Sequence, residues 1–151
     1  MAIISDKDQE FLRKHFEENI TSNVEIIMFT ERPSPIIVPG KQECETCEQT
    51  EALLKEVAAL SDKIDLKVLE IATAAEEAAA YGIDRVPAFV LKGAARGQVR
   101  FFGIPIGYEF SAFIEDLVDT AAGATDLSEE TRSFLASLAE PVNIKVFTTP
   151  T

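Results

Sequence analysis

The sequence has little of what metal and hydrolytic sites usually need, since its 151 residues include two cysteines and one histidine. A closed tetrahedral zinc site takes four Cys or His ligands, which argues against structural zinc within one subunit. His15 lies between Leu12 and Phe16 on an amphipathic stretch without a nearby nucleophile, so a Ser-His-Asp triad is disfavoured and a half-exposed helix residue is expected. Cys44 and Cys47 remain as the candidate chemistry, and we expect no cofactor and no metal ion.

Basic residues and long apolar runs are also scarce. The chain has 14 Lys and Arg against 26 Asp and Glu, a net charge of −12, which repels phosphate backbones and anionic lipid. No apolar run approaches the roughly 18 residues of a membrane helix, and residues 1–4 are too short for a signal peptide. With 46% apolar residues and 7 Gly and 7 Pro, the chain is globular. We expect a cytoplasmic protein without nucleic-acid or membrane partners.

The apolar pattern changes period along the chain and predicts alternating helices and strands. Ser5 and Asp8 form a capping pair before an opening helix, on which Phe11 and Phe16 belong to one apolar face. Apolar residues also recur at helical spacing over 47–60 and 108–122, and the alanine-rich stretch 72–81, closed by Gly82, predicts a short helix. Strands are predicted over 24–30, 64–71, 87–91 and 99–102, the last two as a hairpin. A β-α-β unit followed by a hairpin and a covering helix predicts an α/β fold with a mixed sheet and helices on both faces.

Past residue 122 the pattern begins again, which suggests a second copy that has only started. Residues 143–146 echo 23–26, and an amphipathic helix precedes each of these segments. We therefore expect a first unit over 1–122, then a linker, helix and strand over 123–151 that open a second, truncated unit. The apolar strand expected over 142–147 lacks the rest of its sheet, so it should pair with an edge of the first unit or with another chain as a homodimer. Ser128, Phe134 and Leu135 repeat Ser5, Phe11 and Leu12 at an offset of 123 residues.

The motif Cys44-Glu45-Thr46-Cys47 lies between a strand-then-loop segment and an amphipathic helix, so Cys44 should sit in the first turn of that helix. Positions i and i+3 bring two Cα atoms to about 5 to 6 Å, which suits a disulfide. Unpaired amide groups at a helix start favour an anion and lower the pKa of a thiol. The spacing therefore favours redox chemistry with Cys44 as nucleophile and Cys47 as resolving cysteine, over an inert pair or a metal site shared between subunits.

Charges around the motif set the expected reactivity. Glu43, Glu45 and Glu48 each oppose a thiolate by roughly 0.5 kcal/mol at about 7 Å in a near-aqueous dielectric, while Lys41 offsets one of them. A helix N-terminus contributes about 0.3 to 1 kcal/mol in the opposite direction. We therefore expect a modestly lowered pKa for Cys44 and a weakly oxidising disulfide that acts as a reductant or electron relay.

Val86 and Pro87 form the second notable feature, because proline starts what otherwise reads as a central strand. Proline cannot donate a ladder hydrogen bond, so it belongs at the first residue of a strand or at an unpaired position. A cis peptide bond is plausible at this position, although only about 5% of X-Pro bonds are cis.

The order of elements around the CxxC resembles the thioredoxin fold, and the segments 81–88, 101–105 and 107–110 resemble the glutaredoxin-like protein disulfide oxidoreductases, which hold two such units. The resemblance implies that the chain is the N-terminal unit of such an enzyme. It further implies that Cys44 attacks a disulfide of a protein or small molecule, that Cys47 resolves the mixed disulfide, and that a reductase or reducing thiol regenerates the pair. Pro87 would then be a cis proline facing the cysteines, with the backbone of Val86 pairing with an extended substrate.

The chain departs from this resemblance at three points. The loop before the motif is long, and its residues 36–38 are expected to be buried. The strand before it, 26–29, carries no acid, which leaves Glu48 or water to accept the proton of Cys47. A second CxxC is absent. The alternative function is therefore a non-catalytic thioredoxin-like docking module that supports a second catalytic unit.

Overall fold

The computed structural model describes residues 2–33 and 43–148. Its five helices within this part of the chain are α1 (Asp6–Asn19), α2 (Cys47–Ala58), α3 (Ala75–Tyr81), α4 (Tyr108–Ala122) and α5 (Glu129–Ala136). Its strands are β1 (Val24–Thr30), β2 (Ile64–Glu70), β3 (Ala88–Lys92) and β4 (Val99–Phe102). None of the helices in the described ranges is long and apolar enough to cross a membrane.

The four strands form one mixed sheet in the order β2-β1-β3-β4. β1 and β2 are parallel, with Thr30 beside Glu70, as expected for strands joined through α2. β3 runs antiparallel to both of its neighbours, and Ala88 pairs with Phe29 on one side and Phe102 on the other. The predicted α/β fold with a mixed sheet is therefore confirmed.

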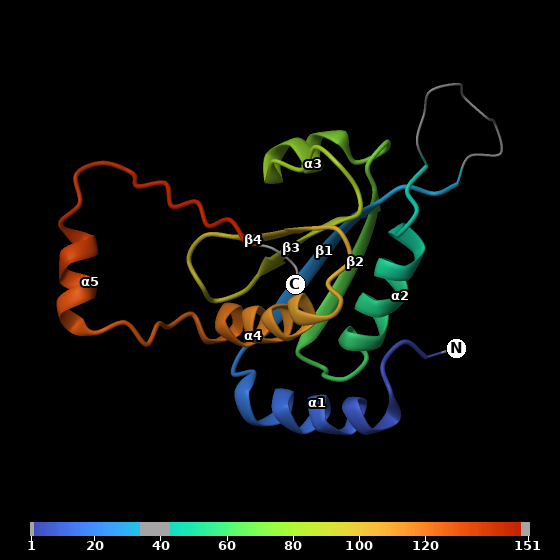
Figure 1. The fold of residues 1–151 in the computed structure, drawn as a ribbon, viewed down its shortest axis with the longest axis horizontal. Coiled ribbons are helices and arrows are strands. Elements are labelled where there is room, and N and C mark those ends of the chain that lie inside the picture. The colour runs from blue at the N-terminus through green and yellow to red at the C-terminus, as the bar shows by residue number, and fades with distance from the viewer. Residues whose placement is uncertain (1, 34–42, 149–151) are drawn as a thin grey trace.

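Helices cover both faces of the sheet. Successive side chains of β1 point to opposite faces, and both sets are buried under helices. Ile26 and Met28 pack into the larger core with residues of α1, α2 and α4, whereas Ile27 and Phe29 pack into a smaller core beneath α3. Figure 1 shows α3 on one side of the sheet and α1 and α4 on the other. This layering leaves the carboxyl ends of β1 and β2 at the edge where α2 begins.

Residues 122–148 lie outside both cores, and every one of them is exposed. The predicted helix of this region is present as α5, held at its start by Ser128, which accepts a hydrogen bond from the backbone of Thr131. The strand predicted over 142–147 is not formed, and no described strand pairs with this segment. Apolar, β-branched residues are not sufficient for a strand without a neighbouring strand to complete its hydrogen bonds.

Candidate functional site

Cys44 and Cys47 form a disulfide, and their Cα atoms lie 5.5 Å apart. Cys47 is the first residue of α2 and is buried, whereas Cys44 lies before the helix and is partly exposed. The expectation that Cys44 belongs to the first turn of the helix was therefore wrong by three residues. The two cysteines differ in exposure, and Cys44 is the one that an external reactant can approach.

The start of α2 is set by Thr46 and Thr50. The backbone carbonyl of Thr46 accepts the first helical hydrogen bond from the Thr50 amide at 2.9 Å, and the buried Thr50 hydroxyl donates to the same oxygen at 2.7 Å. The amides that precede Thr50 in the first turn have no carbonyl within the helix. They lie beside Cys47 and favour negative charge at this end of α2.

Val86 and Pro87 are joined by a cis peptide bond, as the sequence had made plausible. Pro87 directly precedes Ala88, the residue paired with Phe29, so it lies beside Thr30 at the carboxyl end of β1. Because β1 and β2 are parallel and joined through α2, the helix starts at that same end. Figure 1 shows α2 beginning on the side toward which β1 runs. The topology therefore brings the disulfide and Pro87 to one edge of the sheet.

Hydrogen bonding differs between the two residues of this peptide. The Pro87 carbonyl accepts a hydrogen bond from the Gly103 amide at 2.8 Å, which ties it to the end of β4. The backbone N–H and carbonyl of the half-buried Val86 make no hydrogen bond with another described residue. Val86 consequently offers one free donor and one free acceptor at the end of the sheet where the disulfide lies.

The surroundings of the disulfide are acidic on the surface and apolar beneath. Glu43, Glu45 and Glu48 are exposed. Among the described residues, the buried polar side chains are threonines, and no carboxylate is buried near Cys47. No group of three or more potential metal ligands occurs in residues 2–33 and 43–148. Lys41 and residues 36–38, for which we stated expectations, lie outside the described residues.

Arg85 adds a positive charge next to Val86 that the sequence reasoning did not single out. Its Nε donates to Asp84 Oδ1 at 2.9 Å, and its Cζ lies 5.2 Å from the centroid of the Phe102 ring. The hydrogen bond from Arg85 lowers the pKa of Asp84, and the same contact raises the pKa of Arg85. The sequence shows that Arg85 lies next to Val86, but it does not show the contact with Phe102, because that contact depends on how β3 pairs with β4.

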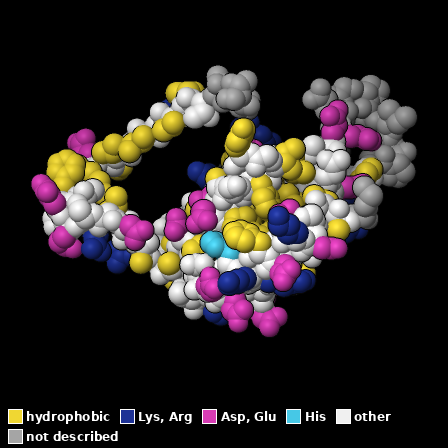
Figure 2. All heavy atoms as spheres, turned by 60° about the horizontal axis from the view of Figure 1, so that its bottom comes forward, with side chains coloured by type: hydrophobic (Ala, Val, Ile, Leu, Met, Phe, Trp, Pro, Cys, Tyr) yellow, Lys and Arg dark blue, Asp and Glu magenta, His cyan; other side chains and the backbone are white. Residues whose placement is uncertain are grey.

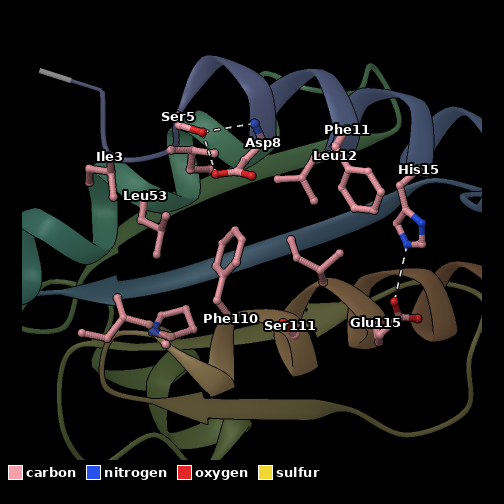
Figure 3. Close-up of a pocket in the computed structure, with 15 residues that line it drawn as sticks. Ile3, Ser5, Asp8, Phe11, Leu12, His15, Leu53, Phe110, Ser111 and Glu115 are labelled. Atoms are coloured by element: carbon pink, nitrogen blue, oxygen red, sulfur yellow. Dashed lines mark hydrogen bonds and ion pairs between the residues drawn. The ribbon is translucent and has the colours of Figure 1, made fainter.

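A separate groove of about 510 Å³ lies between α1 and α4. Figure 2 shows hydrophobic side chains gathered beside the single histidine on this face, and Figure 3 shows Phe11 and Phe110 on opposite walls. His15 Nε2 lies 3.5 Å from Glu115 Oε1 and links the two helices. Phe11, predicted on the apolar face of the first helix, thus lines an open groove. None of the groove residues is a predicted site residue.

The sequence profile of the thioredoxin domain family matches residues 35–115, which is more than half of the chain. No curated protein sequence matches.

Two solved structures have a similar fold. One is a point mutant of the alkylhydroperoxide reductase AhpF from Enterococcus faecalis, with a TM-score of 0.73, 22% identity, and coverage of 89% of this chain and 61% of that chain. The other is a protein disulfide oxidoreductase from Aeropyrum pernix, with a TM-score of 0.72, 26% identity, and coverage of 89% and 55%. This chain therefore spans less than two thirds of the length of either protein.

Proposed function

Because the chain belongs to the thioredoxin domain family, we propose that it exchanges disulfides with protein or small-molecule substrates through Cys44 and Cys47. The observation that carries the proposal is the unequal burial of the disulfide, with a reachable Cys44 and a buried Cys47 at the start of α2. A pair separated by one helical turn opens and closes without rearrangement of the sheet. The likeness to a protein disulfide oxidoreductase supports the same chemistry.

In the proposed reaction the reduced pair donates two electrons to a substrate disulfide. The Cys44 thiolate attacks one substrate sulfur, forms a mixed disulfide and releases the other sulfur as a thiolate. The Cys47 thiolate then attacks Cys44 and releases the second substrate thiolate, which leaves the Cys44–Cys47 disulfide present in the structure. The two protons lost by the cysteines end on the substrate thiols, with Glu48 or water accepting the proton of Cys47. A reductase or reducing thiol returns the pair to the dithiol.

The edge of the sheet supplies the substrate contacts in this proposal. Val86 has an unpaired amide and carbonyl beside the cis Pro87, so an extended segment can add to the edge by main-chain hydrogen bonds. These contacts involve the backbone of Val86 alone, whereas its side chain packs against the smaller core. They therefore accept protein segments of varied sequence around the reacting cysteine.

The exposed carboxylates and the helix start have opposite effects on the Cys44 thiolate. Glu43, Glu45 and Glu48 oppose the charge, and the unpaired amides of α2 favour it. A thiolate that gains little net stabilisation leaves the disulfide weakly oxidising. We therefore assign the pair to reduction or electron relay in the cytoplasm rather than to strong oxidation.

A second candidate function is a docking module that supports another catalytic unit. The observation that favours it is the exposed region from residue 122 to 148, where α5 carries a serine cap like that of α1 but packs against no core. We propose that residues 123–151 open a second thioredoxin-like unit. Residues 142–147 are exposed and are the proposed contact for a homodimer.

Insulin reduction with dithiothreitol as electron donor tests the redox proposal. Cys44→Ser should abolish the stimulation of insulin reduction, because the attacking sulfur is lost. Cys47→Ser should retain attack and accumulate a mixed disulfide visible by mass spectrometry. Ser133→Ala, in exposed α5, is the control with normal activity. If a longer parent protein with both Cys44 and Cys47 replaced by serine reduces insulin as fast as the unmodified parent, the result would instead support the docking function.

A further inference from the structure

We propose that Arg85 is a specificity-determining residue that binds a carboxylate of the substrate segment paired with Val86. This inference rests on the proposed disulfide exchange and adds the chemical class of the preferred substrate, a disulfide with an acidic residue beside its cysteine. The side chain of Arg85 is 71% exposed and belongs to the residue directly before Val86. It therefore lies where the flank of a bound substrate passes.

Arg85 is held in place before any substrate binds. Nε donates to Asp84 Oδ1 at 2.9 Å, Nη2 donates to Asp84 Oδ2 at 3.5 Å, and the guanidinium lies over the Phe102 ring. An arginine fixed by two neighbours loses less conformational entropy on binding than a free one. Asp84 and Phe102 are positioning residues in this proposal.

The remaining edge of the guanidinium fits a second carboxylate. Asp84 occupies the side formed by Nε and one N–H of Nη2, and Nη1 donates to no described residue. The end formed by Nη1 and Nη2 presents two parallel N–H groups, which is the geometry that a carboxylate accepts in a bidentate pair. Asp84 therefore orients Arg85 without using its whole donor set.

The charges at this end of the sheet differ between the side of Arg85 and the side of the CxxC motif. The other described arginine near the end of β1, Arg32, is paired with Glu70 at 2.9 Å. Around Cys44 the exposed charges are the carboxylates of Glu43, Glu45 and Glu48. An acidic substrate residue is thus attracted on the Arg85 side and repelled on the side of the CxxC motif. The preference should depend on which flank of the substrate cysteine carries the acid.

Peptide disulfides test the proposal directly. We would measure kcat/KM for symmetric disulfides of two five-residue peptides with a central Cys and one Glu, placed before or after the Cys, and for their Gln counterparts. One Glu placement should be preferred over its Gln counterpart about fivefold, as expected for one exposed pair of opposite charges. The preference should reside in KM and disappear at high salt, because exposed pairs are screened.

Substitutions then assign that preference to one side chain. Arg85→Gln should bring the Glu-to-Gln ratio to about one, Arg85→Lys should restore it in part, and Arg85→Glu should favour a peptide with Lys at the same position. The control is Arg96→Gln, which removes an exposed arginine from the turn at the opposite end of the β3–β4 hairpin. It should keep the full ratio.

The outcomes separate the two proposals. If the unmodified chain reduces Glu and Gln peptides equally in both placements, or if Arg85→Gln leaves the ratio unchanged, the role of Arg85 is wrong while disulfide exchange stands. If the unmodified chain reduces none of the four peptides and does not reduce insulin, the proposed function itself fails.

Discussion

Helices α1 and α5 begin with the same local signals and lie in opposite environments. Ser5 accepts a hydrogen bond from the Asp8 amide, and Ser128 accepts one from the Thr131 amide, each at 3.2 Å. Leu12 of α1 is 4% exposed because it packs in the main core, whereas Leu135, at the equivalent position of α5, is 46% exposed. Capping and periodicity are therefore enough to form each helix, whereas its burial depends on which elements of the fold pack against it.

The largest difference between these regions should appear when a phenylalanine is removed. Phe16→Ala in α1 should cost about 3 to 5 kcal/mol of unfolding free energy, because the ring is fully buried in the main core. Phe134→Ala in α5 should change it by less than about 0.5 kcal/mol, since that ring is exposed. Denaturant unfolding followed by circular dichroism measures both. Equal losses would show that the two helices share one cooperative core.

The junction between the regions should be the next most sensitive position. Gly123 ends α4 at a φ of 60°, and an added Cβ would lie 2.8 Å from the backbone of Ala94. Gly123→Ala should therefore destabilise the chain by about 2 kcal/mol or more, through strain and a collision with backbone. Gly97→Ala is the control, because its φ of 87° carries the strain but nothing lies within 4 Å. A thermal melt in which both variants lose the same stability would remove the argument for close packing at the junction.

The two serine caps give a smaller and more direct comparison. Ser5→Ala should lower the unfolding free energy by about 1 kcal/mol, since α1 packs into the main core. Ser128→Ala should leave global unfolding unchanged and increase amide hydrogen exchange within α5 alone. If the second variant shifts the global transition by as much as the first, α5 is part of the folded body.

The smallest effect should be a pH dependence of stability that arises from Asp116 in α4. Burial raises the pKa of Asp116, and the nearby Asp119 carboxylate raises it further. The native state therefore binds this proton more tightly than the unfolded chain does, and stability falls as pH rises from 3.8 through the raised pKa. Asp116→Asn should be more stable than the unmodified chain near neutral pH, and the difference should vanish well below 3.8.

Denaturation midpoints across this range check the effect, and Asp126→Asn in the exposed region is the matched control. A stability gain for Asp116→Asn that is constant with pH would contradict a titration origin.

Much of the fold could be predicted from sequence because turn residues mark where its strands begin and end. β1 and β4 have the predicted limits, and α4 has the predicted apolar face. Helix starts were harder to place. The helix expected from residue 72 begins at Ala75, because the Thr73 and Ala74 amides both donate to the Glu70 carbonyl in a turn. Such turns depend on individual hydrogen bonds that periodicity does not encode.

The disulfide and the proline could also be predicted, since both follow from short motifs at the ends of elements. The contact of Arg85 with Phe102 could not, because it joins residues on either side of a hairpin whose register is set by packing. The missing strand over 142–147 has the same origin, since a strand exists only with a neighbour.

A redox titration of Cys44 and Cys47 would show whether this disulfide is a weak or a strong oxidant. The pair would be equilibrated in thiol-disulfide buffers, trapped by alkylation and weighed by mass spectrometry. We predict a single two-electron transition closer to the potential of thioredoxin, about −270 mV, than to that of the strong oxidant DsbA, about −120 mV. A pair that stays in one state over this whole range, or that titrates at the oxidising end, would contradict it.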